Sequence, residues 1–122
     1  LPTLSTCAGT IILAKLVIDG DTHIPNSDIE IQRNAYGRQN ESFEADVKFF
    51  NNNDIYCFIR APKIIRTLNN DVKVIATQIE DIVGVSQNNI VSLTYHPELT
   101  NDNYYLEWLL AFMKEGKYVG SF

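Results

Sequence analysis

The sequence predicts an α/β fold in which helices cover a mixed sheet. Segments with the alternation of half-buried strands recur between residues 29 and 94. A helical pattern stands on each side of them, one directly after Cys7 and one near the carboxyl end. With 122 residues, 45% hydrophobic and 20% charged, the composition is that of one folded domain or part of one. We therefore treat residues 1–122 as a single unit of α/β type.

The first elements surround a cysteine. Residues 1–6 predict a short strand, and residues 8–16 predict a helix that is apolar on most faces and should be buried. Small residues at Ser5, Ala8 and Gly9 leave room for a tight turn at Cys7. A strand, a sharp turn and a helix form the arrangement known as a nucleophile elbow.

The middle of the chain predicts several strands. Residues 19–27 are polar and read as a loop, and residues 51–54 are turn material. The strand patterns include one continuous apolar run, at 55–59, which suggests a central strand, and two runs flanking Gln87-Asn88-Asn89, which suggest a hairpin. These strand segments are 29–31, 43–49, 55–59, 72–76, 82–86 and 90–94.

A final helix is predicted from about residue 103 to residue 117. Asp102 or Asn103 could cap its start. Its apolar residues at helical spacing, which we expect to form the buried face, are Leu106, Leu109, Leu110 and Met113.

Composition excludes several classes of function. The net charge is −5 and the ten Lys and Arg residues are scattered, so no basic stripe is available to bind nucleic acid. The longest apolar runs fall short of a membrane span, and no signal peptide is visible. Two cysteines make no disulfide framework, and the histidines and cysteines lack metal-ligand spacing. We expect a cytoplasmic protein without a metal site.

Three residue types point to nucleophilic catalysis. Cys7 precedes a helix, and His96 and Glu98 follow an apolar strand. A thiol, an imidazole and a carboxylate can act as nucleophile, base and orienting group. Unpaired N–H groups at the start of a helix favour the thiolate, and the Ala8 amide could stabilise an oxyanion. The alternative is that Cys7 is a small core residue and His96 a loop histidine.

The remaining candidates have simpler interpretations. Cys57 lies within an apolar run and is interpreted as a core residue. His23 lies in a polar loop and is interpreted as solvated. Taken alone, Arg33, Arg38 and Arg60 would be surface charges.

The motifs together resemble the glutaminase subunits of pyridoxal 5′-phosphate synthase, a branch of the class I glutamine amidotransferases. The elbow and the His-x-Glu pair would fit many class I enzymes, whereas the two arginine-containing blocks point to this branch. The matching blocks are Thr6-Cys7-Ala8-Gly9, Arg33-Asn34-Ala35-Tyr36-Gly37-Arg38-Gln39, Ser42-Phe43-Glu44-Ala45, Phe58-Ile59-Arg60-Ala61-Pro62 and His96-Pro97-Glu98-Leu99-Thr100.

The resemblance implies a three-layer, flavodoxin-like fold and a mechanism. Cys7 would attack the side-chain amide of L-glutamine to form a glutamyl thioester, with His96 moving the proton and Glu98 holding His96. Arg33, Ile59 and Arg60 would bind glutamine, and ammonia would pass to a separate synthase subunit.

The chain departs from the family mildly at Tyr36 and Tyr95, where Phe is usual, and in two ways that bear on the site. Ser5 stands where the family has Gly, and its side chain could crowd the elbow. The family's first strands and its Gly-Gly-Glu-Ser type loop, which gives a second oxyanion donor, have no counterpart. We therefore expect a partial domain that is poorly active alone and prone to aggregation.

Two other functions stay open at this point. One is a non-catalytic subunit that binds the synthase without hydrolysing glutamine. The other is a class I amidotransferase that serves another pathway, which the block at residues 33–39 disfavours.

Overall fold

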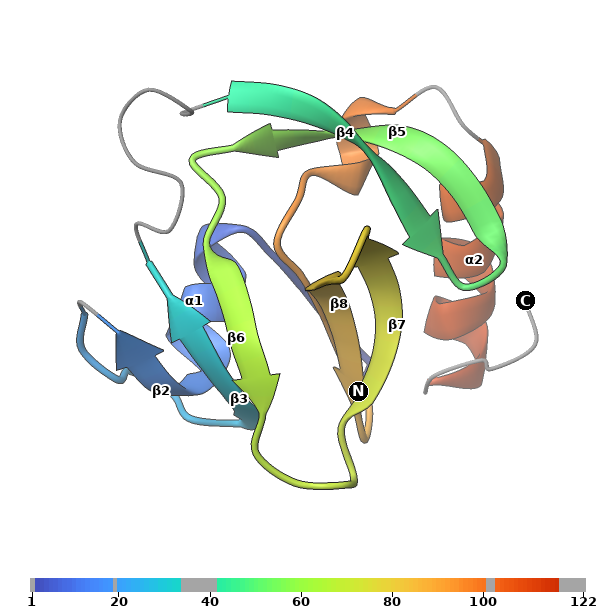
Figure 1. Cartoon of the computed structure of the whole chain (residues 1–122). Coiled ribbons are helices and arrows are strands. Elements are labelled where there is room, and N and C mark those ends of the chain that lie inside the picture. The colour runs from blue at the N-terminus through green and yellow to red at the C-terminus, as the bar shows by residue number, and fades with distance from the viewer. Residues whose placement is uncertain (1, 19, 34–41, 101–102, 117–122) are drawn as a thin grey trace.

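The computed structural model describes residues 2–18, 20–33, 42–100 and 103–116, in which nine strands form one sheet (Figure 1). The elements of the first half are β1 (Thr3–Thr6), α1 (Ala8–Leu13), β2 (Ala14–Ile18), β3 (Ser27–Gln32), β4 (Ser42–Phe49) and β5 (Asn52–Ile59). Those of the second half are β6 (Lys63–Thr67), β7 (Lys73–Gln78), β8 (Asp81–Gln87), β9 (Ile90–Leu93), the 3-10 helix η2 (Pro97–Leu99) and α2 (Asn103–Glu115).

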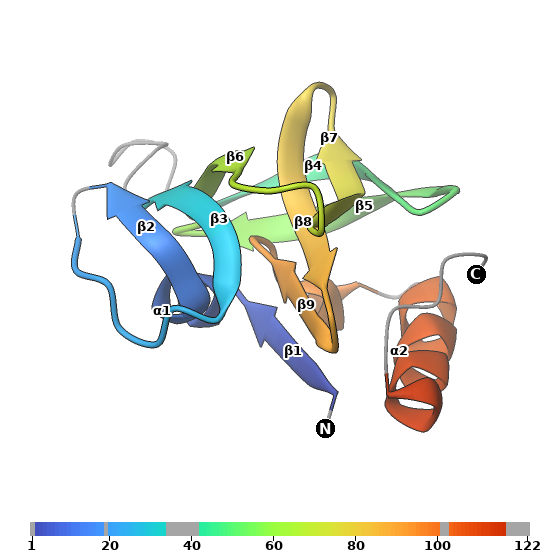
Figure 2. The same ribbon diagram turned by 90° about the horizontal axis from the view of Figure 1, so that it is seen from below.

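The sheet is mixed, as the sequence predicts. Its main path runs β2-β3-β6-β8-β7-β4-β5, and β9 joins β8 to β1. The pairs β1–β9 and β2–β3 are parallel, and the other pairs between described strands are antiparallel. Figure 2 shows β1, β9 and β8 side by side, with α1 at the carboxyl end of β1. The hairpin of β8 and β9 also confirms the prediction for residues 82–94.

Two apolar clusters hold the sheet in place. The larger one lies between the β4–β5 hairpin, β8, β9 and α2, and its largest buried side chains include Trp108, Tyr56 and Tyr95. The smaller one joins β2, β3 and β6 through residues such as Ile29, Ile31 and Ile64. In β3, Ile29 and Ile31 alternate with Asp28 and Glu30, which is the pattern expected of a strand with one buried face.

The first helix is shorter and more exposed than its apolar sequence predicts. It ends at Leu13, and the expected last turn instead begins β2. Residue 14 and residues 16–18 pair with β3, and this tertiary pairing outweighs local helix propensity. Thr10 is its one fully buried residue, and Ile12 is 42% exposed, so the prediction of a buried helix is wrong.

The apolar run at residues 55–59 is not a central strand. It belongs to β5, which ends the main path of the sheet and starts as early as Asn52, inside the predicted turn. Tyr56 and Phe58 point into the core, whereas Ile55 and Ile59 are partly exposed. Cys57 is half-buried and so is not the core residue that the sequence suggested. The apolar residues are continuous in the sequence, but their side chains alternate between the buried and the exposed face of β5.

The last helix buries a different face from the predicted one. Its buried residues are Tyr105, Trp108 and Phe112. Leu106, Leu110 and Met113 are more than half exposed. The aromatic side chains fill the space beneath the β4–β5 hairpin, where Trp108 packs edge-on against Phe49 with a centroid distance of 5.1 Å.

Candidate active site

The turn between β1 and α1 places Cys7 in a strained backbone conformation. Cys7 has φ 49° and ψ −113°, in the half of the map that side-chain-bearing residues rarely adopt. Its N–H donates to the Leu93 carbonyl oxygen at 2.9 Å, and the Cys7 carbonyl oxygen accepts a hydrogen bond from the Thr10 N–H at 3.1 Å. Such a conformation persists only where the surroundings hold it, and it is the geometry expected of a nucleophile elbow.

Hydroxyl groups beneath the elbow hold this turn against β9. The buried Ser5 hydroxyl donates to the Ser92 Oγ at 2.8 Å and lies 3.1 Å from the Thr10 Oγ1. Thr10 in turn donates to the Leu93 carbonyl at 2.7 Å. A Cβ built on Gly9 would lie 3.5 Å from the Ser5 Cβ, which is an ordinary contact. Ser5 is thus accommodated under the elbow rather than crowding it.

His96 is fixed at both its backbone and its ring. Its N–H donates to the Cys57 carbonyl at 2.9 Å, which forms an isolated antiparallel bridge to β5. Its Nδ1 lies 2.9 Å from the Glu98 Oε2. Pro97 and Glu98 begin the short helix η2, which folds the carboxylate back toward the ring. A carboxylate on Nδ1 selects the tautomer that leaves Nε2 for proton transfer.

The end of β5 reaches the cysteine as well. The Cys7 thiol donates a hydrogen bond to the Ile59 carbonyl with an Sγ–O distance of 3.3 Å, and its Sγ lies 4.0 Å from the Arg60 carbonyl oxygen. Arg60 has a positive φ of 47°. The same strand therefore contacts the nucleophile candidate and, through Cys57, the base candidate.

The resting cysteine is a thiol rather than the thiolate expected at a helix start. Burial raises the pKa of Cys7, and the negative charge of Glu98 raises it further. The Ala8 amide, which bonds the sulfur, lowers the pKa but does not outweigh burial. The sequence predicted that N–H groups at the start of the helix favour the thiolate, but the desolvation of the sulfur is the larger effect and could not be read from residue order.

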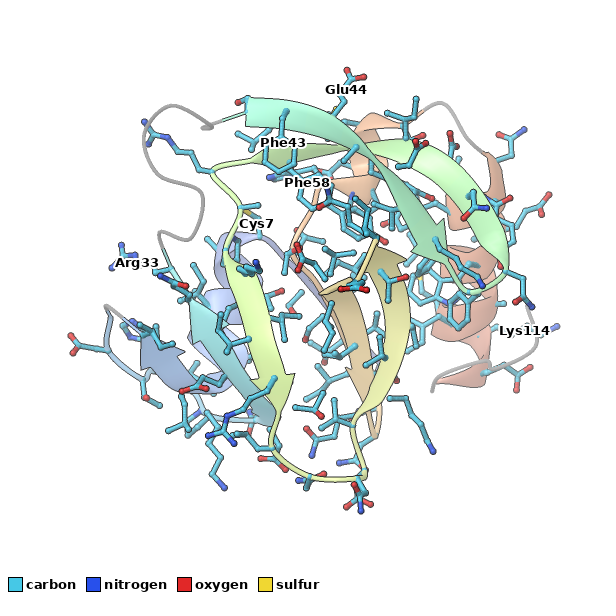
Figure 3. The ribbon with its side chains drawn as sticks, in the orientation of Figure 1. Cys7, Arg33, Phe43, Glu44, Phe58 and Lys114 are labelled. Carbon is cyan, nitrogen blue, oxygen red and sulfur yellow. The ribbon has the colours of Figure 1, made fainter. Side chains whose placement is uncertain are left out.

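One cavity of about 620 Å³ joins most of the predicted site residues. Cys7, Ala8, His96, Ile59 and Arg60 line it together with Arg33. Figure 3 shows Arg33 to the left of Cys7, on the side of the molecule where β2 and β3 lie. Glu98 is connected to the cavity through its hydrogen bond to the His96 ring. The fold thus brings residues from five separated segments to one concavity.

The cavity has a wall that the sequence did not indicate. Gly20, Asp21 and His23, from the loop between β2 and β3, line it, although His23 was interpreted as a solvated loop residue. His23 is exposed, yet it faces this cavity. No sequence motif predicts a site at these residues, because only the parallel pairing of β2 and β3 brings their loop to the cavity. Asn34 to Gln39, the rest of the Arg33 block, lie outside the described residues.

Two features of other protein classes are missing from the described part of the chain. Within it, no group of three His, Cys, Asp or Glu side chains is placed to hold a metal ion. Nor does any helix there have the length and apolar character needed to cross a membrane.

Comparison with known proteins identifies the family. The SNO glutamine amidotransferase family matches residues 1–115. The chain belongs to this family. A crystal structure of a glutamine amidotransferase superposes with a TM-score of 0.80 at 34% identity, covering 91% of this chain and 60% of that one. The α/β fold is therefore that of the glutamine amidotransferases, as the sequence predicts.

Similar curated proteins include subunits of one synthase from different organisms. The pyridoxal 5′-phosphate synthase subunit PdxT of Thermococcus onnurineus is 46% identical over 115 residues, which are 90% of this chain and 58% of that protein. PdxT of Geobacillus thermodenitrificans is 40% identical over 98% of this chain and 63% of its own length. The chain thus spans about three-fifths of the length of these relatives.

Proposed function

We propose that the protein is a glutaminase that hydrolyses L-glutamine to glutamate and ammonia, with Cys7 as nucleophile, His96 as proton carrier and Glu98 as the group that orients His96. The observation that supports this proposal is that the strained Cys7 and the Glu98-bound His96 line the same cavity. Family membership supports the same chemistry.

The first step forms a thioester. The Cys7 proton moves to the Nε2 of His96 as the sulfur attacks the amide carbon of glutamine, and the resulting oxyanion accepts a hydrogen bond from the Ala8 N–H. The protonated His96 then gives the proton to the departing nitrogen, which leaves as ammonia. Glu98 stabilises the imidazolium between these transfers, at its 2.9 Å distance from Nδ1.

The second step releases glutamate. His96 takes a proton from water as the water oxygen attacks the thioester carbon, and it returns the proton to the Cys7 sulfur as the C–S bond breaks. No metal or organic cofactor enters this sequence. In this proposal Arg33, which lines the cavity, pairs with the substrate carboxylate, and the backbone of Ile59 and Arg60 forms the wall beside the sulfur.

The partner is a pyridoxal 5′-phosphate synthase subunit that receives the ammonia. The names of the relatives support this choice over an amidotransferase of another pathway. The relatives are longer than the matched region, so the proposal also holds that residues 1–122 are poorly active without the part of the fold that supplies a second oxyanion donor.

Selective labelling tests the nucleophile. The protein from the complete coding sequence, mixed with its synthase partner, is treated with the glutamine-mimicking electrophile 6-diazo-5-oxo-L-norleucine, and the labelled cysteine is identified by mass spectrometry. We expect label on Cys7, protection by L-glutamine, and loss of both label and glutamate production in Cys7→Ala. Cys57→Ala is the matched control and should keep both.

Two outcomes would count against the proposal. Glutamate production that persists in Cys7→Ala would reject Cys7 as nucleophile. Absence of selective labelling, with binding to the synthase retained, would instead favour the non-catalytic subunit.

A further inference from the structure

The cavity is lined by both apolar and charged residues. Cys7, Ile11 and His96 line it, and the Ile59 carbonyl oxygen lies beside the Cys7 sulfur. The loop between β2 and β3 adds Gly20, Asp21 and His23, and Arg33 follows β3. The lining therefore includes two opposite charges, Asp21 and Arg33, which come from other segments than the one that carries the nucleophile.

Gly20, the residue before Asp21, lies close to the Arg33 side chain. A Cβ built on Gly20 would lie 2.9 Å from the Val17 Cγ1 and 3.5 Å from the Arg33 Cδ. A side chain at residue 20 would therefore clash with Val17, and it would contact the Arg33 side chain at an ordinary distance. Asp21 is the next residue, and it lines the same cavity as Arg33.

Glutamine has a matching distribution of charge. Its amide must reach the Cys7 sulfur, and two methylene groups separate that amide from the carbon that bears the ammonium and carboxylate groups. A site that recognises the free amino acid therefore needs an anion partner and a cation partner on one side of the cavity. Among the described residues that line the cavity, Asp21 has the sole carboxylate. Glu98 hydrogen-bonds the His96 ring and is not part of this lining.

We propose that Asp21 binds the α-ammonium group of glutamine beside Arg33, which binds the α-carboxylate, and that the pair makes the site specific for the free α-amino acid. This inference rests on the proposed glutaminase function and adds a residue to its substrate site. Asp21 is exposed in the unliganded cavity, so it is accessible to a substrate that enters from solvent.

The test compares two substrates in the complete protein with its synthase partner. L-Glutamine is compared with glutaramate, which keeps the amide, the methylene groups and one carboxylate but lacks the ammonium group. In Asp21→Asn we expect the KM for L-glutamine to rise roughly three- to tenfold with kcat unchanged, as for a charge pair near solvent. The KM for glutaramate should stay the same.

Two control variants sharpen the comparison. Arg33→Lys should raise the KM for both substrates, since both carry the carboxylate. Asp46→Asn removes an exposed aspartate of β4 that does not line the cavity, and it should change neither constant.

The possible outcomes separate the two proposals. If Asp21→Asn changes both substrates equally, or changes neither, Asp21 does not bind the ammonium group, although the glutaminase function stands. If the wild-type protein hydrolyses neither substrate and Cys7 is not labelled selectively, the proposed function fails and this inference fails with it.

Discussion

The Cys7 thiol donates a hydrogen bond to the carbonyl oxygen of Ile59 across an Sγ–O distance of 3.3 Å. A carbonyl oxygen accepts a hydrogen bond from a thiol but has no hydrogen with which to stabilise a thiolate. The last residues of β5 therefore favour the neutral thiol, in the same direction as the burial that raises the pKa of Cys7. Under our proposal, the S–H group must turn from Ile59 toward His96 before the sulfur can attack.

Alkylation should report this resting thiol. A cysteine whose pKa is raised carries less thiolate near neutral pH than an ordinary thiol, so iodoacetamide should modify Cys7 slowly at about pH 7–8. As the pH is raised, the alkylation rate should increase with a midpoint pH above that of a cysteine in an unstructured peptide. The pH profile is measured by mass spectrometry on Cys57→Ala, so that a single thiol reacts. A midpoint below that of the peptide would contradict the buried, carbonyl-bonded thiol.

Glu98→Gln should speed the alkylation of the Cys7 thiol but lower kcat for glutamine. The carboxylate raises the pKa of Cys7, so its removal should lower that pKa and speed alkylation near neutral pH. The carboxylate also bonds the Nδ1 of His96, so its loss should reduce kcat for glutamine by about ten- to a hundredfold, part of what general acid–base catalysis supplies. Alkylation profiles and glutamate production are measured on the same samples. Parallel loss of both would indicate general disruption of the site instead.

The hydroxyl network under the elbow should contribute to stability. Ser5→Ala removes the donor to Ser92 and the neighbour of Thr10 in a buried site, and it should lower the free energy of unfolding by about 1–2 kcal/mol. Urea unfolding measures this, and Ser42→Ala, at an exposed position of β4, is the control. An unchanged midpoint for Ser5→Ala would show that the three hydroxyl groups do not hold the turn.

Residue order predicted the fold class and the elbow because both depend on local signals. Small residues around Cys7, alternation in β3 and β4, and the β8–β9 hairpin are each encoded within a few positions. The resemblance, rather than any periodicity, selected Arg33 and Arg60. The pairing of β2 and the burial of Cys7 depend on contacts between distant segments, and no short pattern reports those.

The last helix shows most clearly that residue spacing alone does not decide which side chains are buried. Leu106, Leu110 and Met113 have the spacing of a buried stripe, yet they are exposed. Tyr105, Trp108 and Phe112 have an equally regular spacing and are buried. The two faces differ in side-chain shape, and only the space left beneath the β4–β5 hairpin decides between them.

A pair of substitutions on α2 therefore measures which face supports the fold. Trp108 is fully buried and stacks on Phe112 at a centroid distance of 5.2 Å, so Trp108→Ala should cost about 3–5 kcal/mol of unfolding free energy. Leu110 is 68% exposed, so Leu110→Ala should cost less than about 0.5 kcal/mol. Both values come from urea unfolding monitored by circular dichroism, since the tryptophan probe is lost in one variant. A larger cost at Leu110 than at Trp108 would mean that the leucine face packs against protein and the aromatic face does not.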